Sequence, residues 1–214
     1  MLLDEIARSV SGGQAVQTSR LVEQALADGL EPGSVLNDGL MAGLTVIGER
    51  FKRNDCYIPE VLLAAKAMHA GMSLLRPLLA GGGERLRDKI VLGTVESDIH
   101  DIGKNLVGMM LEGAGYRVID LGVNVPAGRF LAALEEHAAP VLAMSALLST
   151  TMPRLQATIA ELEKAGVRER VKVLVGGAPV TREYAQRIGA DGYAPEAASA
   201  VDLVLDLLAP APTV

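Results

Sequence analysis

The chain has 214 residues, of which 50% are hydrophobic and 21% are charged. This length and composition allow a buried core and two modest domains. The formal net charge of −6 argues against a nucleic-acid surface, which needs clustered Lys and Arg. The sequence shows no signal peptide and no segment apolar enough to span a membrane, so we expect a cytoplasmic protein. The lone Cys56 excludes an intrachain disulfide framework.

The first eighty or so residues have the pattern of a helical bundle. Val61, Leu62, Ala65 and Met68 recur at helical spacing before Pro77. Gly81-Gly82-Gly83 is the clearest linker and predicts two domains, residues 1–83 and 84–214. Turns are expected at Ser11-Gly12-Gly13, at Gly29 and at Pro32-Gly33.

Beyond the linker, short apolar strands alternate with helical segments. This alternation predicts an α/β domain with a doubly wound parallel sheet. Five strands and five helices would give a flavodoxin-like topology. The expected strands are 90–95, 116–122, 141–147, 171–175 and a short strand at 191–193.

A histidine loop follows the first of these strands. The segment 98–105, Asp-Ile-His-Asp-Ile-Gly-Lys-Asn, leads into a helix that stops near Gly113. His100 therefore lies at the carboxyl end of a strand, where open parallel sheets bind ligands. Asp98 could accept the proton of one ring nitrogen and leave the other nitrogen with its lone pair available.

His100 could be a metal ligand, a general base or a packed loop residue. The chain has three His and one Cys, and His69 and His137 fall in separate helical patterns. A site with several protein ligands is therefore not expected. One protein ligand suffices only where something else, such as a macrocycle, completes the coordination of the metal.

Two further segments end on the same edge of the predicted sheet. One is 145–151, Ser-Ala-Leu-Leu-Ser-Thr-Thr, and the other is Gly176-Gly177. The hydroxyl groups could simply cap the helix that begins near Met152, and the glycine pair could be an ordinary turn. A nucleotide-binding loop is not indicated, because Asp98 occupies the first glycine position of a P-loop and no G-x-G-x-x-G follows the strand.

Taken together, Asp98-x-His100-x-x-Gly103, Ser145-x-Leu147 and Gly176-Gly177 resemble the cobalamin-binding signature of methionine synthase modules and of small corrinoid proteins in methyltransferase systems. The resemblance implies cobalamin bound base-off and histidine-on, with His100 as the lower ligand of cobalt. It implies a relay from His100 through Asp98 to Thr151. Further cofactor contacts would come from Ser97, Ile99, Asp101, Ser145, Leu147, Ser149, Gly176, Gly177, Tyr193 and Ala197.

The resemblance extends to the first part of the chain, where 39–51 and 57–62 look like the helical cap that precedes such cobalamin domains. Phe51, Ile58 and Val61 match positions that cover the upper face of the corrin, although their hydrophobic pattern alone is also typical of a plain core. Two positions depart from the family pattern. Glu96-Ser97 replaces a lysine or glycine pair, and Asn124 replaces an acidic or hydrophobic residue.

The resemblance implies a methyl carrier without autonomous catalysis. A donor-specific methyltransferase would load a methyl group onto Co(I), and a second methyltransferase would pass it from methyl-Co(III) to a thiol or tetrahydrofolate. The resemblance also implies a reductive activase as a third partner. The alternatives are a cobalamin-dependent sensor, for which no DNA-binding helix-turn-helix segment is evident, and the small subunit of a mutase, which generally lacks the cap.

Overall fold

The computed structural model describes residues 1–81 and 87–209. The chain separates into two compact units, Met1–Arg87 with Met109–Tyr116, and Asp88–Gly108 with Arg117–Val214. The expected boundary between residues 83 and 84 and the glycines Gly82 and Gly83 of the predicted linker lie outside the described residues. Within the described ranges, no helix is both long and apolar enough to cross a bilayer.

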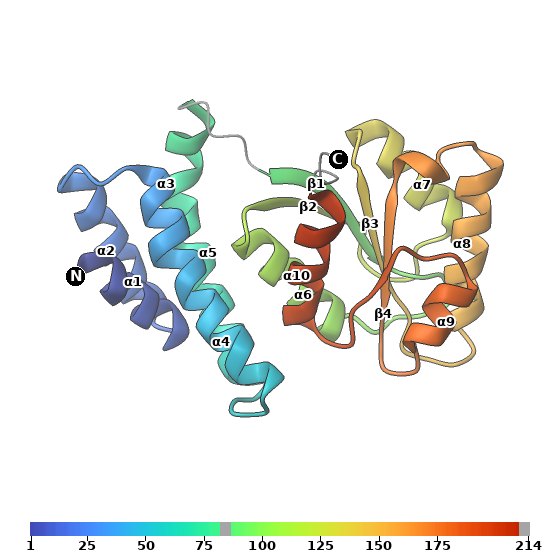
Figure 1. Ribbon diagram of the computed structural model, residues 1–214, viewed down its shortest axis with the longest axis horizontal. Helices are drawn as coiled ribbons and strands as arrows, with labels where there is room; N and C mark the ends of the chain where they lie inside the picture. The colour runs from blue at the N-terminus through green and yellow to red at the C-terminus, as the bar shows by residue number, and fades with distance from the viewer. Residues whose placement is uncertain (82–86, 210–214) are drawn as a thin grey trace, which may run out of the picture. The chain divides into compact units, whose positions relative to one another are not determined.

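The first unit is helical, as its apolar periodicity predicts (Figure 1). Pro32-Gly33, expected as a turn, instead begins a helix, because proline has the right φ for the first helical position. The last helix continues past Pro77. The elements are α1 (Leu2–Ser11), α2 (Ala15–Ala27), α3 (Pro32–Ser34), the π-helix η1 (Val35–Met41), α4 (Ala42–Lys52) and α5 (Ile58–Gly81).

Small residues let the helices of this unit approach closely. A Cβ on Gly43 of α4 would lie 2.4 Å from the carbonyl oxygen of Ala7 in α1, so this crossing requires glycine. Ser9 and Thr18 are buried and satisfy each other through a 2.8 Å hydrogen bond between their hydroxyl groups. The unit therefore has a close-packed core of its own.

The second unit is built on a five-stranded parallel sheet with the order β2-β1-β3-β4-β5. The predicted flavodoxin-like fold is confirmed. The strands expected at 116–122 and 141–147 each end two residues earlier, at Asp120 and Ser145. The strands are β1 (Arg87–Thr94), β2 (Tyr116–Asp120), β3 (Val141–Ser145), β4 (Lys172–Gly176) and β5 (Gly192–Tyr193).

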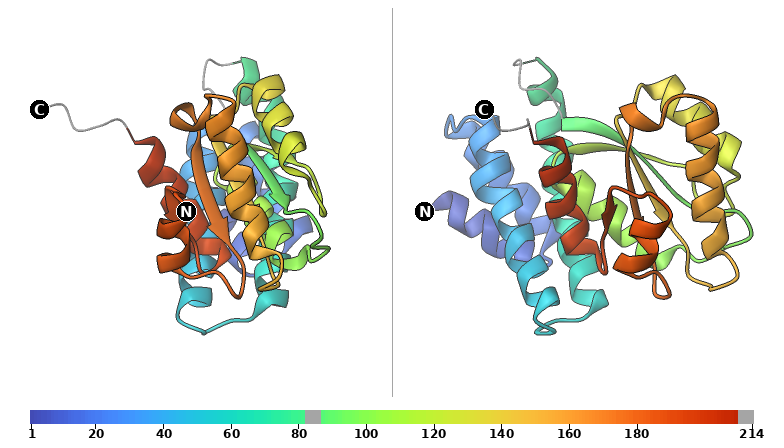
Figure 2. Two further views of the ribbon diagram at one scale, coloured as in Figure 1. Left: turned by 90° about the vertical axis from the view of Figure 1, so that its right-hand side faces the viewer. Right: turned by 45° about the vertical axis from the view of Figure 1, so that its right-hand side comes forward.

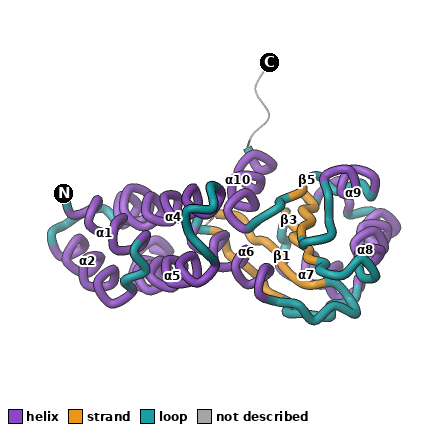
Figure 3. Tube along the Cα trace, turned by 90° about the horizontal axis from the view of Figure 1, so that it is seen from below, coloured by secondary structure: helices purple, strands orange, loops and turns teal. Residues whose placement is uncertain are grey.

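Helices cover both faces of this sheet (Figures 2 and 3). Successive residues of β1 face opposite ways: Leu92 meets Gly108 of α6, whereas Gly93 meets Phe130 of α7. Buried side chains of α7, α8 and α9 form one cluster with the inward residues of β1, β3 and β4. The helices are α6 (Ile102–Gly113), α7 (Ala127–His137), α8 (Met152–Lys164), the 3-10 turn η2 (Arg168–Arg170), α9 (Arg182–Arg187) and α10 (Ala197–Leu208).

The three central strands end at one level of the sheet. Thr94 of β1 pairs with Ser145 of β3, and Ser145 pairs with Gly176 of β4. The loops that carry the predicted histidine, serine and glycine anchors therefore leave the sheet side by side. This common edge brings together residues that lie far apart in the sequence.

Candidate functional site

The histidine loop leaves β1 through a tight turn. The Asp98 N–H donates to the carbonyl oxygen of Val95 over 3.1 Å, and Ser97 inside the turn has a left-handed φ of 66°. The buried Thr94 hydroxyl donates to the carbonyl oxygen of His100 over 2.8 Å. The main chain on both sides of Asp98 is thus tied to the end of the sheet before α6 begins.

His100 is fixed through one ring nitrogen. Its Nδ1 lies 2.7 Å from Oδ1 of Asp98. An ionised carboxylate can only accept a hydrogen bond, so Nδ1 is the donor that carries the hydrogen and Nε2 keeps its lone pair. The His100 side chain is 45% exposed whereas that of Asp98 is 0% exposed, so a buried carboxylate orients a ring that is accessible to a ligand.

Asp98 receives several hydrogen bonds in addition to the one from the His100 ring. Its Oδ2 accepts from the Thr151 hydroxyl and from the Leu147 N–H, both over 2.7 Å, and its Oδ1 accepts from the His100 N–H over 3.1 Å. Burial raises the pKa of this carboxyl group, but the bonds from Thr151, Leu147 and His100 outweigh burial and hold the pKa well below its usual range. Asp98 is therefore a buried carboxylate with its charge satisfied.

Large apolar side chains are exposed around this histidine. Ile99 is 75% exposed and Ile102 is 66% exposed on the histidine loop and at the start of α6. Leu147 and Leu148, on the loop after β3, are 38% and 42% exposed. Exposed apolar residues that gather beside a functional group indicate a surface that an apolar partner covers.

The glycine pair leaves room for backbone contacts. Gly177 has a φ of 121°, and a Cβ there would lie 2.0 Å from the carbonyl oxygen of Ala146. The Ala146 N–H also donates to the carbonyl oxygen of Gly176 over 3.1 Å. Glycine at 177 is therefore required by the close approach of the loops after β3 and β4.

The donor set fits a metal held mainly by a macrocycle. Across residues 1–81 and 87–209, no three His, Cys, Asp or Glu side chains come together as a metal site. His100 nevertheless has the carboxylate partner that metal-bound histidines typically have. One oriented imidazole beside exposed apolar groups suits a cobalt corrin, which brings its own equatorial ligands.

Comparisons with known proteins agree with this chemistry. Two family models described as B12 binding domains match residues 2–76 and 88–202. A corrinoid protein of Desulfitobacterium hafniense is 40% identical, and a dimethylamine corrinoid protein of Methanosarcina barkeri is 41% identical; each alignment spans 97% of this chain and 97% or 98% of the relative. The chain belongs to the corrinoid proteins of methyltransferase systems.

Solved structures support this family assignment. A cobalamin-binding protein from Desulfitobacterium hafniense superposes with a TM-score of 0.83 at 30% identity, over 97% of this chain and 98% of the other. The methanol:cobalamin methyltransferase complex of Methanosarcina barkeri also gives 0.83, at 28% identity, over 96% of this chain and 79% of the other. The prediction of a helical cap followed by a Rossmann-like domain is thus confirmed.

The remaining predicted cofactor residues of this corrinoid protein differ in exposure. Ser149 is exposed in the turn after β3, and Ser145 and Tyr193 are half-buried at strand ends. Ala197, at the start of α10, is buried. Thr151 is the residue before α8, but its hydroxyl makes no capping bond to the helix, so the simple capping interpretation is wrong for Thr151.

The three predicted cap residues differ in exposure. Ile58 is 43% exposed and Phe51 is half-buried, whereas Val61 is 0% exposed in the core of the helical unit. Val61 therefore has no accessible surface in this structure. Ile58 is therefore the most accessible of the three.

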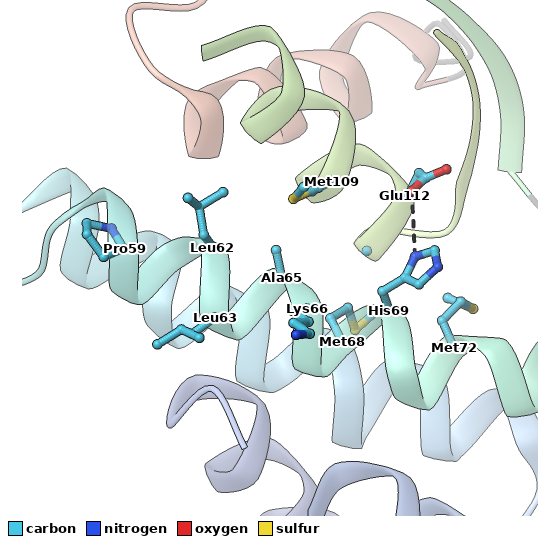
Figure 4. Close-up of a pocket in the computed structure, with 11 residues that line it drawn as sticks. Pro59, Leu62, Leu63, Ala65, Lys66, Met68, His69, Met72, Met109 and Glu112 are labelled. Atoms are coloured by element: carbon cyan, nitrogen blue, oxygen red, sulfur yellow. Dashed lines mark ion pairs between the residues drawn. The ribbon is translucent and has the colours of Figure 1, made fainter. Parts of the chain in front are cut away.

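The helical unit also holds an apolar pocket of about 730 Å³ (Figure 4). A weak ion pair crosses its wall, from Nδ1 of His69 to Glu112 over 3.8 Å. No motif in the sequence predicts this pocket, because most of its lining residues have the helical spacing of an ordinary core. The lining comes from α5 and the end of α6: Pro59, Leu62, Leu63, Ala65, Lys66, Met68, His69, Met72, Met109, Glu112 and Gly113.

Thr94 and the N–H of Leu147 are site contacts that motif reasoning missed. In the sequence, Thr94 has only the pattern of a residue at the end of a buried strand. The contact of a main-chain N–H cannot be predicted from the residue type. The register of parallel strands is the signal that could have found them, because it aligns Thr94 with Ser145.

Proposed function

We propose that the chain is a methyl-carrying corrinoid protein that binds cobalamin base-off, with Nε2 of His100 as the lower ligand of cobalt. The observation that carries this proposal is the pairing of an accessible His100 ring with a fully buried Asp98 carboxylate. The carboxylate fixes the tautomer that leaves Nε2 unprotonated, which is the form a metal requires. The match of both chain segments to B12 binding domains supports the same proposal.

The chain's own residues orient the ligand and exclude water. Asp98, which accepts the hydrogen bond from Nδ1, would hold the imidazole and adjust its basicity, and Thr151 would act through its own bond to Asp98. Cobalamin, when bound, supplies a cobalt centre that can accept a methyl group and release it. The exposed Ile99, Ile102 and Leu148 would pack against apolar parts of the cofactor and become buried.

Further contacts are assigned by their place on the same edge. Ser145, Ser149 and the Gly176-Gly177 turn would line the slot for the nucleotide tail, where a missing Cβ permits close approach of the backbone. Phe51 and Ile58, in a cap of residues 1–83, would shield the upper face of a corrin held by residues 84–214, whereas Val61, which is buried, would contribute only as core beneath them. The remaining proposed cofactor contacts are Ser97, Asp101, Gly103, Leu147, Tyr193 and Ala197.

The partners follow from the relatives. Several are named dimethylamine or trimethylamine corrinoid proteins, and one similar structure is a methanol:cobalamin methyltransferase complex. We infer that a donor-specific methyltransferase loads this chain from a methylated amine or alcohol. A second methyltransferase would take the methyl group to a thiol or tetrahydrofolate, and a reductive activase would restore cobalt after accidental oxidation.

The test is the visible spectrum after reconstitution with hydroxocobalamin. The wild-type chain should retain the corrin and lose the signature of bound dimethylbenzimidazole, and His100→Ala should change the spectrum again. His137→Ala is the matched control, because His137 ends α7 and lies outside the loop. A wild-type chain that retains no corrin absorbance would refute the proposal.

A further inference from the structure

Asn124 connects the loop after β2 to the histidine loop through two hydrogen bonds. Its side-chain Oδ1 accepts from the Ser97 N–H over 2.7 Å. Its own N–H donates to the carbonyl oxygen of Asp98 over 2.9 Å. One residue thus holds the main chain on either side of the bond that joins Ser97 to Asp98.

The backbone conformation at this contact has to be stabilised by neighbouring residues. Ser97 has a φ of 66° and Asn124 a φ of 55°, both in the left-handed region. Asparagine tolerates this region better than most residues, whereas serine has no such preference. A non-glycine residue keeps a left-handed φ only where its surroundings fix it, and the bond to Asn124 is the side-chain contact that fixes Ser97.

Asn124 is itself anchored by the sheet. Val125, the next residue, is buried, bridges to Val95 in parallel and donates its N–H to the carbonyl oxygen of Thr94 over 3.0 Å. On the other side, the carbonyl oxygen of Gly122 accepts from the Thr94 N–H over 2.9 Å. The position of Asn124 is therefore set by the end of β1, so it can act as a fixed point for the loop that follows.

Asp98 is consequently held from two directions. The loop after β3 holds its carboxylate, through Thr151 and the Leu147 N–H. The loop after β2 holds its main chain, through Asn124. Because His100 takes its orientation from that carboxylate over 2.7 Å, a shift of the Asp98 main chain would move the imidazole.

We propose that Asn124 is a positioning residue that sets the place of His100 as the lower ligand of cobalt, acting through the main chain of Ser97 and Asp98. This inference rests on the proposed function and adds a residue to it. It also gives a role to the two places where the sequence departs from its family pattern, since Ser97 and Asn124 contact each other.

The decisive variant is Asn124→Gly, which keeps a left-handed backbone accessible and removes the acceptor for the Ser97 N–H. We expect about tenfold weaker binding of hydroxocobalamin and a smaller histidine-ligated fraction at saturation. Tenfold is the low end of the loss that follows when a residue supporting a metal ligand is removed. Asn124→Asp, which keeps an acceptor oxygen, should restore both. Asn54→Gly is the matched control, because Asn54 also has a left-handed φ, of 58°, but lies outside the loops at this edge of the sheet, so both values should stay unchanged.

A second measurement uses the wild-type chain without cofactor, so it does not depend on whether a variant folds. Hydrogen exchange of the cofactor-free wild-type chain should show the Ser97 amide protected to a degree comparable with its hydrogen-bonded neighbour Asp98. An unprotected Ser97 amide would overturn the inference. A wild-type spectrum identical to that of His100→Ala would overturn the proposed function, whereas a normal wild-type spectrum shared by Asn124→Gly would overturn only the positioning role.

Discussion

Asp98 is held through both oxygens of its carboxylate, and the Thr151 hydroxyl is the side-chain donor that reaches it from the loop after β3. A hydrogen bond to a buried charge contributes more to stability than a neutral one. Thr151→Val keeps the shape of the side chain and removes this donor. Thr151→Val therefore tests the hydrogen-bond relay from His100 through Asp98 to Thr151 directly.

We expect Thr151→Val to lower the free energy of unfolding by about 1.5–3 kcal/mol and to weaken histidine ligation after reconstitution. Urea denaturation of the cofactor-free chain checks the first effect, and the visible spectrum checks the second. Thr158→Val is the control, because the Thr158 hydroxyl donates to the carbonyl oxygen of Arg154 within α8 and lies outside the relay. Equal effects of the two variants on the spectrum would contradict the relay.

Tyr184 gives a test of pH dependence away from the histidine. Its hydroxyl donates to the carbonyl oxygen of Met152 over 2.7 Å. Burial raises the pKa of Tyr184, with a smaller opposing effect of Arg187. A group whose folded-state pKa is raised contributes stability below its unfolded pKa of about 10, and this contribution is lost as the pH rises through the folded value.

Tyr184→Phe should therefore lower the free energy of unfolding by about 1 kcal/mol at pH 8, through loss of the hydrogen bond. Above about pH 10 the difference between wild type and variant should shrink, because the wild-type chain loses its extra contribution there. Urea denaturation at pH 8 and at alkaline pH checks this. A difference that grows with pH would contradict the assigned direction.

At the scale of elements, the loops after β3 and β4 meet at Gly177. Gly177→Ala would bring a Cβ to 2.0 Å from the carbonyl oxygen of Ala146, at a φ of 121°. We expect a loss of at least about 3 kcal/mol in the free energy of unfolding, because backbone would have to move. Urea denaturation measures this loss.

Gly166→Ala is the matched control for that substitution. Gly166 also has a left-handed φ, of 70°, but a Cβ there would meet nothing within 4 Å. The free energy of unfolding of Gly166→Ala should therefore fall only by the cost of backbone strain, about 1 kcal/mol. Similar losses at Gly166 and Gly177 would show that the close approach of the two loops is not what requires glycine.

At the scale of the whole molecule, both parts of the chain match B12 binding domains, so the cofactor should stabilise the folded chain. Hydroxocobalamin at a free concentration 100 times its Kd should raise the free energy of unfolding by about 2.7 kcal/mol. Thermal or urea unfolding with and without the cofactor checks this. Inorganic Co²⁺ is the control and should give no comparable increase. An unchanged free energy of unfolding in the presence of hydroxocobalamin would contradict cobalamin binding.

The residue pattern by itself predicted the helical first part and the alternation of strands and helices. It also placed the histidine, serine and glycine anchors at one edge, because the carboxyl ends of parallel strands meet there. The pairing of Thr94, Ser145 and Gly176 follows from that rule. Strand ends were predicted less well: β3 stops at Ser145, because the Leu147 N–H turns away to Asp98.

Only the tertiary structure decided which atoms of these loops meet. Asp98 lies 49 residues from Leu147 and 53 from Thr151, and Ser97 lies 27 from Asn124. Hydrophobic periodicity reports which face a residue takes within its own element, and it carries no information on contacts between loops. The sequence therefore determined that His100 lies at the carboxyl end of a strand, whereas contacts between the loops after neighbouring strands determined what holds it there.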